Sequence, residues 1–302
     1  KAASSGAIGL GPDSWARSDS TFAVFGDAQP SSIAAVAIGV GTVASGAAAL
    51  ALGRDAYGLA ASSISLGKSR ASGADSLAAA ITSNTATYGA TGANSVAIGY
   101  QAKATSEDGK AIGALATATG IGAFAVSTGS GSFGATASGA YSIAMGRSLT
   151  VSGQLSFGGG QGVVSGSNAI GWGFSYTCDA DHAVTLGSFA NAYGIKGRIA
   201  FGNPNGYAGK SAAGQLTMSK ATTDATPAAL ASDGNAGSTN NQVILPNNSA
   251  FAFHGTIVAR QQAAGTACAA WKIEGLIRRE GSAGTTVLVN SATTVLDNTP
   301  AW

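Results

Sequence analysis

The chain has 302 residues and a formal net charge of +2, and only 10 % of its residues are charged. Ordinary soluble domains carry about 25 % charged residues. Proteins bind nucleic acids and membrane surfaces through clustered Lys and Arg, so the small net charge and the low share of charged residues predict neither partner. No run approaches the ~20 apolar residues needed to span a bilayer, and membrane insertion is therefore not predicted. Because the sequence begins at Lys1 without Met and ends abruptly at Trp302, we expect it to be a piece of a longer chain.

A short phrase, apolar–Ala–apolar–Gly, recurs along the chain at a spacing near fourteen residues. It reads VAIG at 36–39, LALG at 50–53 and VAIG again at 96–99. A fixed short period is typical of a solenoid, in which each coil buries its apolar face only against its neighbours. The alternation within the phrase predicts a β-strand with the two larger residues on one face and Ala on the other. We expect two short strands and two turns in each coil.

Proline and composition divide the chain. After Pro30 no Pro occurs until Pro204, which fits a ladder that needs every backbone N–H. We therefore predict a β-solenoid over residues 1–202, followed by a linker rich in Gly, Ser, Thr and Asn over 203–241. Residues 242–302 are expected to form an antiparallel β-sandwich-like module, incomplete at its C-terminus. Its predicted strands lie at 242–245, 251–260, 270–278 and 285–290.

A coil of fourteen residues has a very thin interior, and one of its faces is expected to carry mostly Ala and Ser. Small residues on a flat face let another chain approach closely. These features predict a symmetric homo-oligomer, with a monomeric solenoid of wider coils as the alternative.

The rhythm changes in three places, at 77–94, 127–134 and 171–187, where the last step lengthens to sixteen residues. Insertions in a solenoid map to loops on one side, often the binding side. In the last break, Trp172, Phe174 and Tyr176 fall two residues apart and so are expected to share one face of a strand. With His182 they are our receptor-contact candidates, because exposed rings stack on sugars or anchor protein contacts. Alternatively, the rings plug the axis of an oligomer or cap a widened coil.

Other polar groups give little support for catalysis or metal binding. Asp179, Asp181 and His182 are a weak metal candidate without a visible fourth ligand, so no metal and no cofactor are predicted. We predict that the chain is not an enzyme, since it lacks clustered polar groups. For Cys178 and Cys268 we favour two separate buried thiols, with a disulfide between them as the alternative.

The phrases NSVAIG at 94–99, YSIAMG at 141–146 and SNAIG at 167–171 closely resemble the head repeats of YadA-like trimeric autotransporter adhesins. The resemblance covers about two-thirds of the chain. It implies a left-handed parallel β-roll with three chains packed about one axis. The sequence departs from the family's full pattern, because no neck motif, heptad stalk or membrane-anchor barrel is visible in it.

The C-terminal stretch, from QVILPNN at 242–248 through RQQ at 260–262 to WKIEG at 271–275, instead resembles modules near the ends of bacteriophage tail fibres and tailspikes. Phages use the same head-type β-roll in their fibres. This resemblance favours a virion protein, with the bacterial cell surface as the alternative location.

Together these features predict a homotrimeric bacteriophage tail fibre that attaches to the host cell. The roll would be a stiff spacer and residues 242–302 a distal or trimer-clamping module. Its implied partners are a host surface polysaccharide or outer-membrane protein and other virion tail proteins. The alternatives are the head of a bacterial trimeric autotransporter adhesin and, from another class, a polysaccharide-degrading tailspike.

Overall fold

The structure is a computed structural model that describes residues 2–25, 29–82, 87–129, 132–203, 213–224, 226–262 and 267–299. It divides into two compact units, Lys1–Gln242 and Val243–Trp302. Pro204 and parts of the predicted linker (204–212 and 225) lie outside the described residues, as does the C-terminal end from 300 to 302.

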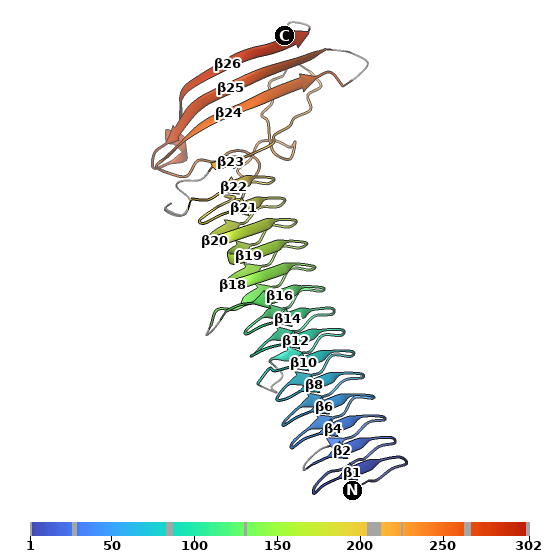
Figure 1. The fold of residues 1–302 in the computed structure, drawn as a ribbon. Coiled ribbons are helices and arrows are strands. Elements are labelled where there is room, and N and C mark those ends of the chain that lie inside the picture. Colours follow the sequence, from blue (N-terminus) through green and yellow to red (C-terminus); the bar gives the residue numbers. More distant parts are fainter. Residues whose placement is uncertain are drawn as a thin grey trace. The chain divides into compact units, whose positions relative to one another are not determined.

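The first unit is a parallel β-solenoid of about 13 turns with coils of about fourteen residues, which confirms the predicted all-β architecture (Figure 1). Each coil contains one strand of a first series, here called an A strand, and one shorter B strand. Every A strand pairs in parallel with the A strands of the coils before and after it. The A strands are β1 (Ile8–Leu10), β2 (Phe22–Val24), β4 (Val36–Ile38), β6 (Leu50–Leu52), β8 (Ile64–Leu66), β10 (Leu77–Ala79), β12 (Val96–Ile98), β14 (Lys110–Ile112), β16 (Phe124–Ser127), β21 (Val184–Leu186) and β22 (Ile199–Phe201).

The B strands stack in the same way on the other side of the coil. They are β3 (Gln29–Pro30), β5 (Val43–Ala44), β7 (Tyr57–Gly58), β9 (Arg70–Ala71), β11 (Gly89–Ala90), β13 (Lys103–Ala104), β15 (Thr117–Ala118) and β17 (Ala135–Ala137). In three coils the A and B strands run into one another as β18 (Ile143–Val151), β19 (Phe157–Val164) and β20 (Ile170–Cys178). Antiparallel β23 (Ala213–Gln215) pairs with β22.

The core of the solenoid is built mainly from Ala. The middle residue of each A strand points inward, and Ala37, Ala51 and Ala97 are fully buried, while the two flanking residues point out. The alternation of the sequence therefore predicted the strands correctly. Our interpretation of the two faces was wrong, because the Ala face lines the coil and the larger residues form the outer surface.

Each coil turns at two corners. At the corner after the A strand, a Gly adopts a conformation that L side chains rarely take: Gly99 has φ +120°, and a Cβ there would lie 2.8 Å from the Gly113 carbonyl. At the corner before the A strand, Ser or Thr side chains close the turn, as when the Ser95 hydroxyl donates to the Gly92 carbonyl oxygen at 2.7 Å. These bonds satisfy backbone groups that the ladder leaves open.

The coil lengths locate the insertions. Successive A strands are offset by about fourteen residues except between Leu77 and Val96 and between Phe124 and Ile143, where five residues are added. Both insertions follow an A strand and precede a B strand, so we call this corner the loop corner. Ile170 pairs with Val184 at the ordinary spacing. The third predicted insertion, at 171–187, is therefore wrong.

The last coil is closed differently from the others. Arg198 takes the inward position that Ala183 holds one coil earlier, and its side chain is buried with the guanidinium 5.1 Å from the Tyr193 ring. Burial lowers the pKa of Arg198. The polypeptide from 226 to Gln242 also packs within this unit, where the buried Asn241 amide donates to Asp233 at 2.8 Å and to the Ala236 carbonyl at 2.9 Å.

The second unit is an antiparallel sheet of three long strands, β24 (Ser249–Arg260), β25 (Cys268–Arg279) and β26 (Val287–Thr299). This confirms the predicted antiparallel module. The described residues form one sheet rather than two sandwich layers, and 242–245 forms no strand.

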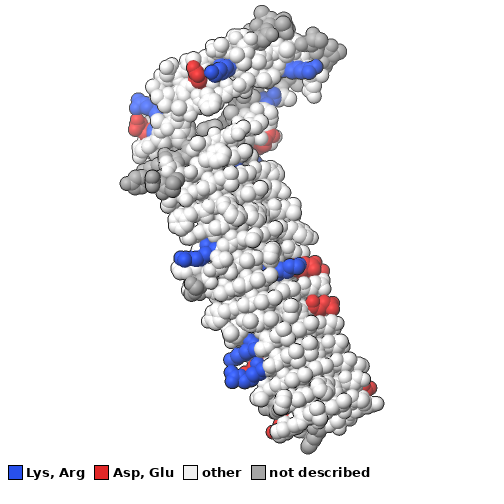
Figure 2. Space-filling model, viewed as in Figure 1, with Lys and Arg blue, Asp and Glu red and all other residues white. Residues whose placement is uncertain are grey.

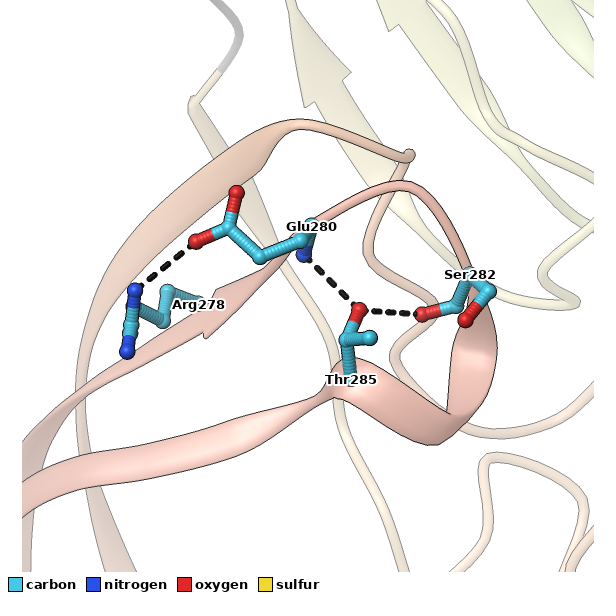
Figure 3. Close-up of polar contacts among 4 residues, drawn as sticks. All are labelled: Arg278, Glu280, Ser282 and Thr285. Atoms are coloured by element: carbon cyan, nitrogen blue, oxygen red, sulfur yellow. Dashed lines mark hydrogen bonds and ion pairs between the residues drawn. The ribbon is translucent and has the colours of Figure 1, made fainter.

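The turn between β25 and β26 contains a 3-10 helix, η1 (Ala283–Thr285). Here Arg278 pairs with Glu280 at 2.7 Å (Figure 3). The Thr285 hydroxyl accepts the Glu280 amide at 3.1 Å and donates to the Ser282 carbonyl at 2.7 Å. These bonds fix the reversal that brings β26 alongside β25.

Candidate interaction surfaces

The outward residues of the A strands form an apolar surface that follows the whole solenoid. Their register aligns them in two columns, one on each side of the buried central residue. We call these columns the outward stripe. The first column is Ile8, Phe22, Val36, Leu50, Ile64, Leu77, Val96, Lys110, Phe124, Ile143, Phe157, Ile170, Val184 and Ile199, and the second is Leu10, Val24, Ile38, Leu52, Leu66, Ala79, Ile98, Ile112, Val126, Met145, Gly159, Trp172, Leu186 and Phe201.

The stripe carries one charged residue, Lys110, whose ammonium donates to the Asp108 carbonyl oxygen at 3.0 Å. Figure 2 shows that charged side chains are few and scattered over the visible face of the coils. Monomeric soluble proteins rarely expose a contiguous apolar patch of more than a few hundred Å², and larger patches mark interaction sites. The stripe is therefore the foremost candidate interface of the solenoid.

The four predicted receptor-contact residues do not lie on one face. Trp172 is 52 % exposed in the outward stripe and stacks on Phe157 of the preceding coil, with ring centroids 5.8 Å apart. Phe174 is 50 % exposed at the loop corner and meets Phe189 edge to face at 5.9 Å. His182 is exposed at the opposite corner, with φ +56°. Tyr176 is only 1 % exposed and points into the coil.

Two unusual backbone conformations separate these rings. Gly173 has φ +145° and Ser175 has φ +53°, and the register with β19 shifts between Gln161 and Gly162. An alternating pattern assumes extended backbone throughout, and each positive φ redirects the following side chains. The prediction that Trp172, Phe174 and Tyr176 share a face was wrong for this reason.

The Tyr176 ring fills space that neighbouring glycines leave inside the coil. A Cβ added at Gly158 would lie 3.2 Å from its hydroxyl oxygen, and one added at Gly162 would lie 2.7 Å from its ring. A Cβ at Gly171 would overlap the ring edge. Burial raises the pKa of Tyr176 well above its usual range. Tyr176 is thus part of the core of the coil.

The carboxylates of the two weak metal-ligand candidates bond to backbone amides at the corners. Asp179 accepts from the Gly194 amide at 2.8 Å, and Asp181 accepts from the Ser167 amide at 3.0 Å. Within the described ranges, no group of three or more His, Cys, Asp or Glu side chains is placed to hold a metal ion. Asp179 and Asp181 therefore serve the stacking of neighbouring coils.

The two cysteines lie in different environments. Cys178 is fully buried and forms no disulfide, and its thiol lies 3.4 Å from the Ile170 and Ala183 carbonyl oxygens. Burial raises the pKa of Cys178 to about 11, which leaves very little reactive thiolate at neutral pH. Cys268, in contrast, is exposed. The prediction of two buried thiols was right for Cys178 and wrong for Cys268.

The loop corner carries exposed groups that the aromatic pattern did not reveal. Phe133, in the second inserted loop, is 48 % exposed and lies 4.8 Å beneath the Arg147 guanidinium. Tyr100 is 52 % exposed at the same corner, and Phe174 lies farther along it. An open groove beside Phe133 is lined mainly by hydroxyl and amide groups, namely Gln101, Ser132, Thr136, Ser148 and Thr150. The irregular spacing at 127–134 was the sequence signal for this surface.

Fold and surface together define a repetitive β-solenoid with the apolar outward stripe along one side. The family model for the YadA head domain repeat matches the chain in two copies, over residues 31–56, 90–116 and 133–148. The chain is thus similar to YadA heads in its repeats as well as in its β-roll, and this points to an adhesin-like or fibre protein. A search of curated proteins found no match. Among the described residues, no helix is both long and apolar enough to cross a membrane.

Proposed function

We propose that this chain is part of a homotrimeric attachment fibre in which three solenoids pack through the outward stripe. The observation that carries this proposal is the stripe itself, which continues through every A strand with Lys110 as its one charged member. The coil interior holds mainly Ala and buries little apolar area per residue. Covering the larger outward side chains would add the burial that the coil lacks. The match to YadA head repeats supports three chains about one axis.

At a finer level, we propose that the fibre is a bacteriophage tail fibre carried on the virion. The resemblance of residues 242–275 to modules at the ends of tail fibres supports this assignment. The head of a bacterial trimeric autotransporter adhesin, displayed on the cell surface, is the second candidate, since the repeat match fits it equally. Virion structural genes beside the coding sequence would favour the fibre, whereas a continuation into a stalk and membrane anchor would favour the adhesin.

We propose a binding role rather than an enzymatic one, with a host surface polysaccharide or outer-membrane protein as the partner. Trimer packing would cover Trp172, because it lies in the stripe. The loop corner remains open, and Phe174, Phe133 and Arg147 offer ring faces and a cation there. Such rings stack on sugars or anchor protein contacts, and other virion tail proteins would hold the fibre by a different surface.

Binding of labelled full-length protein to susceptible bacteria tests the site. Replacing Phe174 or Arg147 with Ala should weaken binding about 10-fold, a typical cost of removing one interface anchor. Tyr141→Ala is the matched control, because Tyr141 is a comparably exposed ring, 57 %, at the opposite corner. Wild-type binding by Phe174→Ala and Arg147→Ala would contradict the loop-corner site. Release of reducing ends from host polysaccharide would instead support the polysaccharide-degrading tailspike.

A further inference from the structure

The sheet of the second unit has one apolar face and one polar face. Residues that pair across β24, β25 and β26 give three rows on the first face: Phe251–Ile277–Leu288, Gly255–Ile273–Thr293 and Ile257–Trp271–Val295. On the opposite face, His254 pairs with Glu274, and Thr256 with Lys272. The burial pattern of β24 alternates strictly over all twelve residues, which keeps the two sets apart. The sheet is therefore amphipathic in the manner of a sheet that packs on a second layer.

The described part of the second unit contains no such layer. Within it, only Leu245 and Ala269 are buried hydrophobic residues, at 5 % and 3 % exposure. Phe253, which lies over Gly275 on the apolar face, is half-buried, as are Ile273 and Ile277. In β26, Leu288 and Val295 remain 54 % and 55 % exposed. A sheet with one apolar face is stabilised when that face is removed from water.

Identical copies of the sheet are the partners that we expect to cover this apolar face, because the rest of the chain brings them close together. In the proposed trimer, the first unit of each chain ends at Gln242 and the second unit begins at the next residue. Three copies are thereby tethered together at a high effective concentration. The apolar faces are chemically matched, and closed cyclic symmetry would let each cover its neighbours.

The repetitive solenoid also needs such a unit. Because A strands repeat at about 4.8 Å, three stripes displaced by one coil would still oppose aliphatic residues to aliphatic residues. The rows of the second unit do not repeat, so their contacts differ at each level. Non-repeating contacts form fully only when the three chains are aligned, so they favour the aligned trimer over trimers in which one chain is displaced by a coil.

We propose that the apolar faces of three copies of this sheet close against one another and hold the three solenoids in register. The proposal rests on the trimer proposed above. It assigns residues 249–299 a defined role, a self-association clamp whose contacts are Phe253, Ile257, Trp271 and Ile273, rather than a receptor-binding tip.

Photo-cross-linking in the full-length protein identifies what covers the face. Phe253 is replaced by p-benzoylphenylalanine, and Val258, which is 72 % exposed on the opposite face, receives the same substitution as the control. We expect the probe at 253 to link two chains, seen at twice the chain mass on a denaturing gel, with the attached peptide within 249–299. The probe at 258 should give several-fold less of this product. Links confined to one chain, or no links above the control, would overturn the clamp.

A second pair of variants measures the energetic role of the face. Ile257→Asp buries a charge on the apolar face, whereas Val258→Asp places the same group on the open face of the same strand. We expect Ile257→Asp alone to lower the midpoint of thermal dissociation, by more than 5 °C. Equal midpoints for the two variants would overturn the proposal. Sedimentation velocity separates the two ideas: a monomeric wild type contradicts the trimer itself, whereas a trimer with equal midpoints contradicts only the clamp.

Discussion

At the scale of single residues, the core of the solenoid stays filled because a smaller side chain at one position is compensated by a larger one at a neighbouring position. We call this volume exchange. In most coils an Ala fills the inward place of the A strand, and Ala144 is one example. In the next two coils Gly158 and Gly171 occupy this place, and Tyr176 supplies the missing volume from the following B segment. Interiors packed to this density respond to the addition of one methyl group.

This exchange predicts strong coupling between Gly171 and Tyr176. Gly171→Ala would drive a Cβ into the Tyr176 ring, and overpacking of this kind costs about 1–3 kcal/mol. In a Tyr176→Ala background the same change should cost much less, because the ring is gone and only the Val164 methyl, 2.8 Å from the added Cβ, still crowds it. Denaturant unfolding of the four proteins of this double-mutant cycle measures the coupling. An equal cost of Gly171→Ala in both backgrounds would refute the account of the core.

At the scale of strands and corners, the glycines that end the A strands are not equivalent. Gly99 combines φ +120° with close contact to Gly113, whereas Gly67 has φ +68° and no atom within 4 Å of an added Cβ. L residues reach the conformation of Gly67 at a cost of about 1 kcal/mol, but they do not reach that of Gly99 without strain and displacement of the next coil.

These two glycines therefore predict different tolerance to alanine at the same corner of two coils. Gly67→Ala should lower the free energy of unfolding by about 1 kcal/mol, and Gly99→Ala by about 3 kcal/mol or more. Thermal and denaturant unfolding of the two single variants give the comparison. If Gly99→Ala proved as mild as Gly67→Ala, backbone crowding between successive corners would not be what requires Gly.

Much of the element-level structure could be predicted because the repeat averages over many coils. The phrase at 36–39 and its copies were enough to give the parallel strands and the coil length. The fate of the aromatic row could not be predicted, because the positive φ values of Gly173 and Ser175 carry no signal in an alternating pattern. The false insertion at 171–187 arose from matching Gly171, an inward glycine, with the corner glycine Gly187.

The facing of the strands was misjudged for a related reason. At the middle of most A strands the thin coil has room for a side chain no larger than Ala or Ser, so the larger members of the phrase point outward. This reverses the usual expectation that large apolar residues form the core. The candidate receptor residues dispersed as a result, with Trp172 in the stripe, Phe174 at the loop corner and Tyr176 inside the coil.

At the scale of the whole molecule, the outward stripe is the apolar surface that a single chain leaves uncovered. Two valines of neighbouring strands, Val36 in the stripe and Val43 on the outer side of the B strands, are both half-buried and outward. If the stripe is the interface, a charge at Val36 would be brought close to its two copies and desolvated, whereas a charge at Val43 would remain in water. The same substitution at the two sites thus separates an effect on association from an effect on folding.

Sedimentation velocity of the 302-residue chain tests the central claim most directly. We predict a single species close to three times the chain mass of 29.1 kDa, which Val43→Asp preserves and Val36→Asp shifts toward smaller species at the same concentration. A wild-type protein that sediments as a 29.1 kDa monomer at all concentrations, or a trimer that Val36→Asp and Val43→Asp affect alike, would contradict the account.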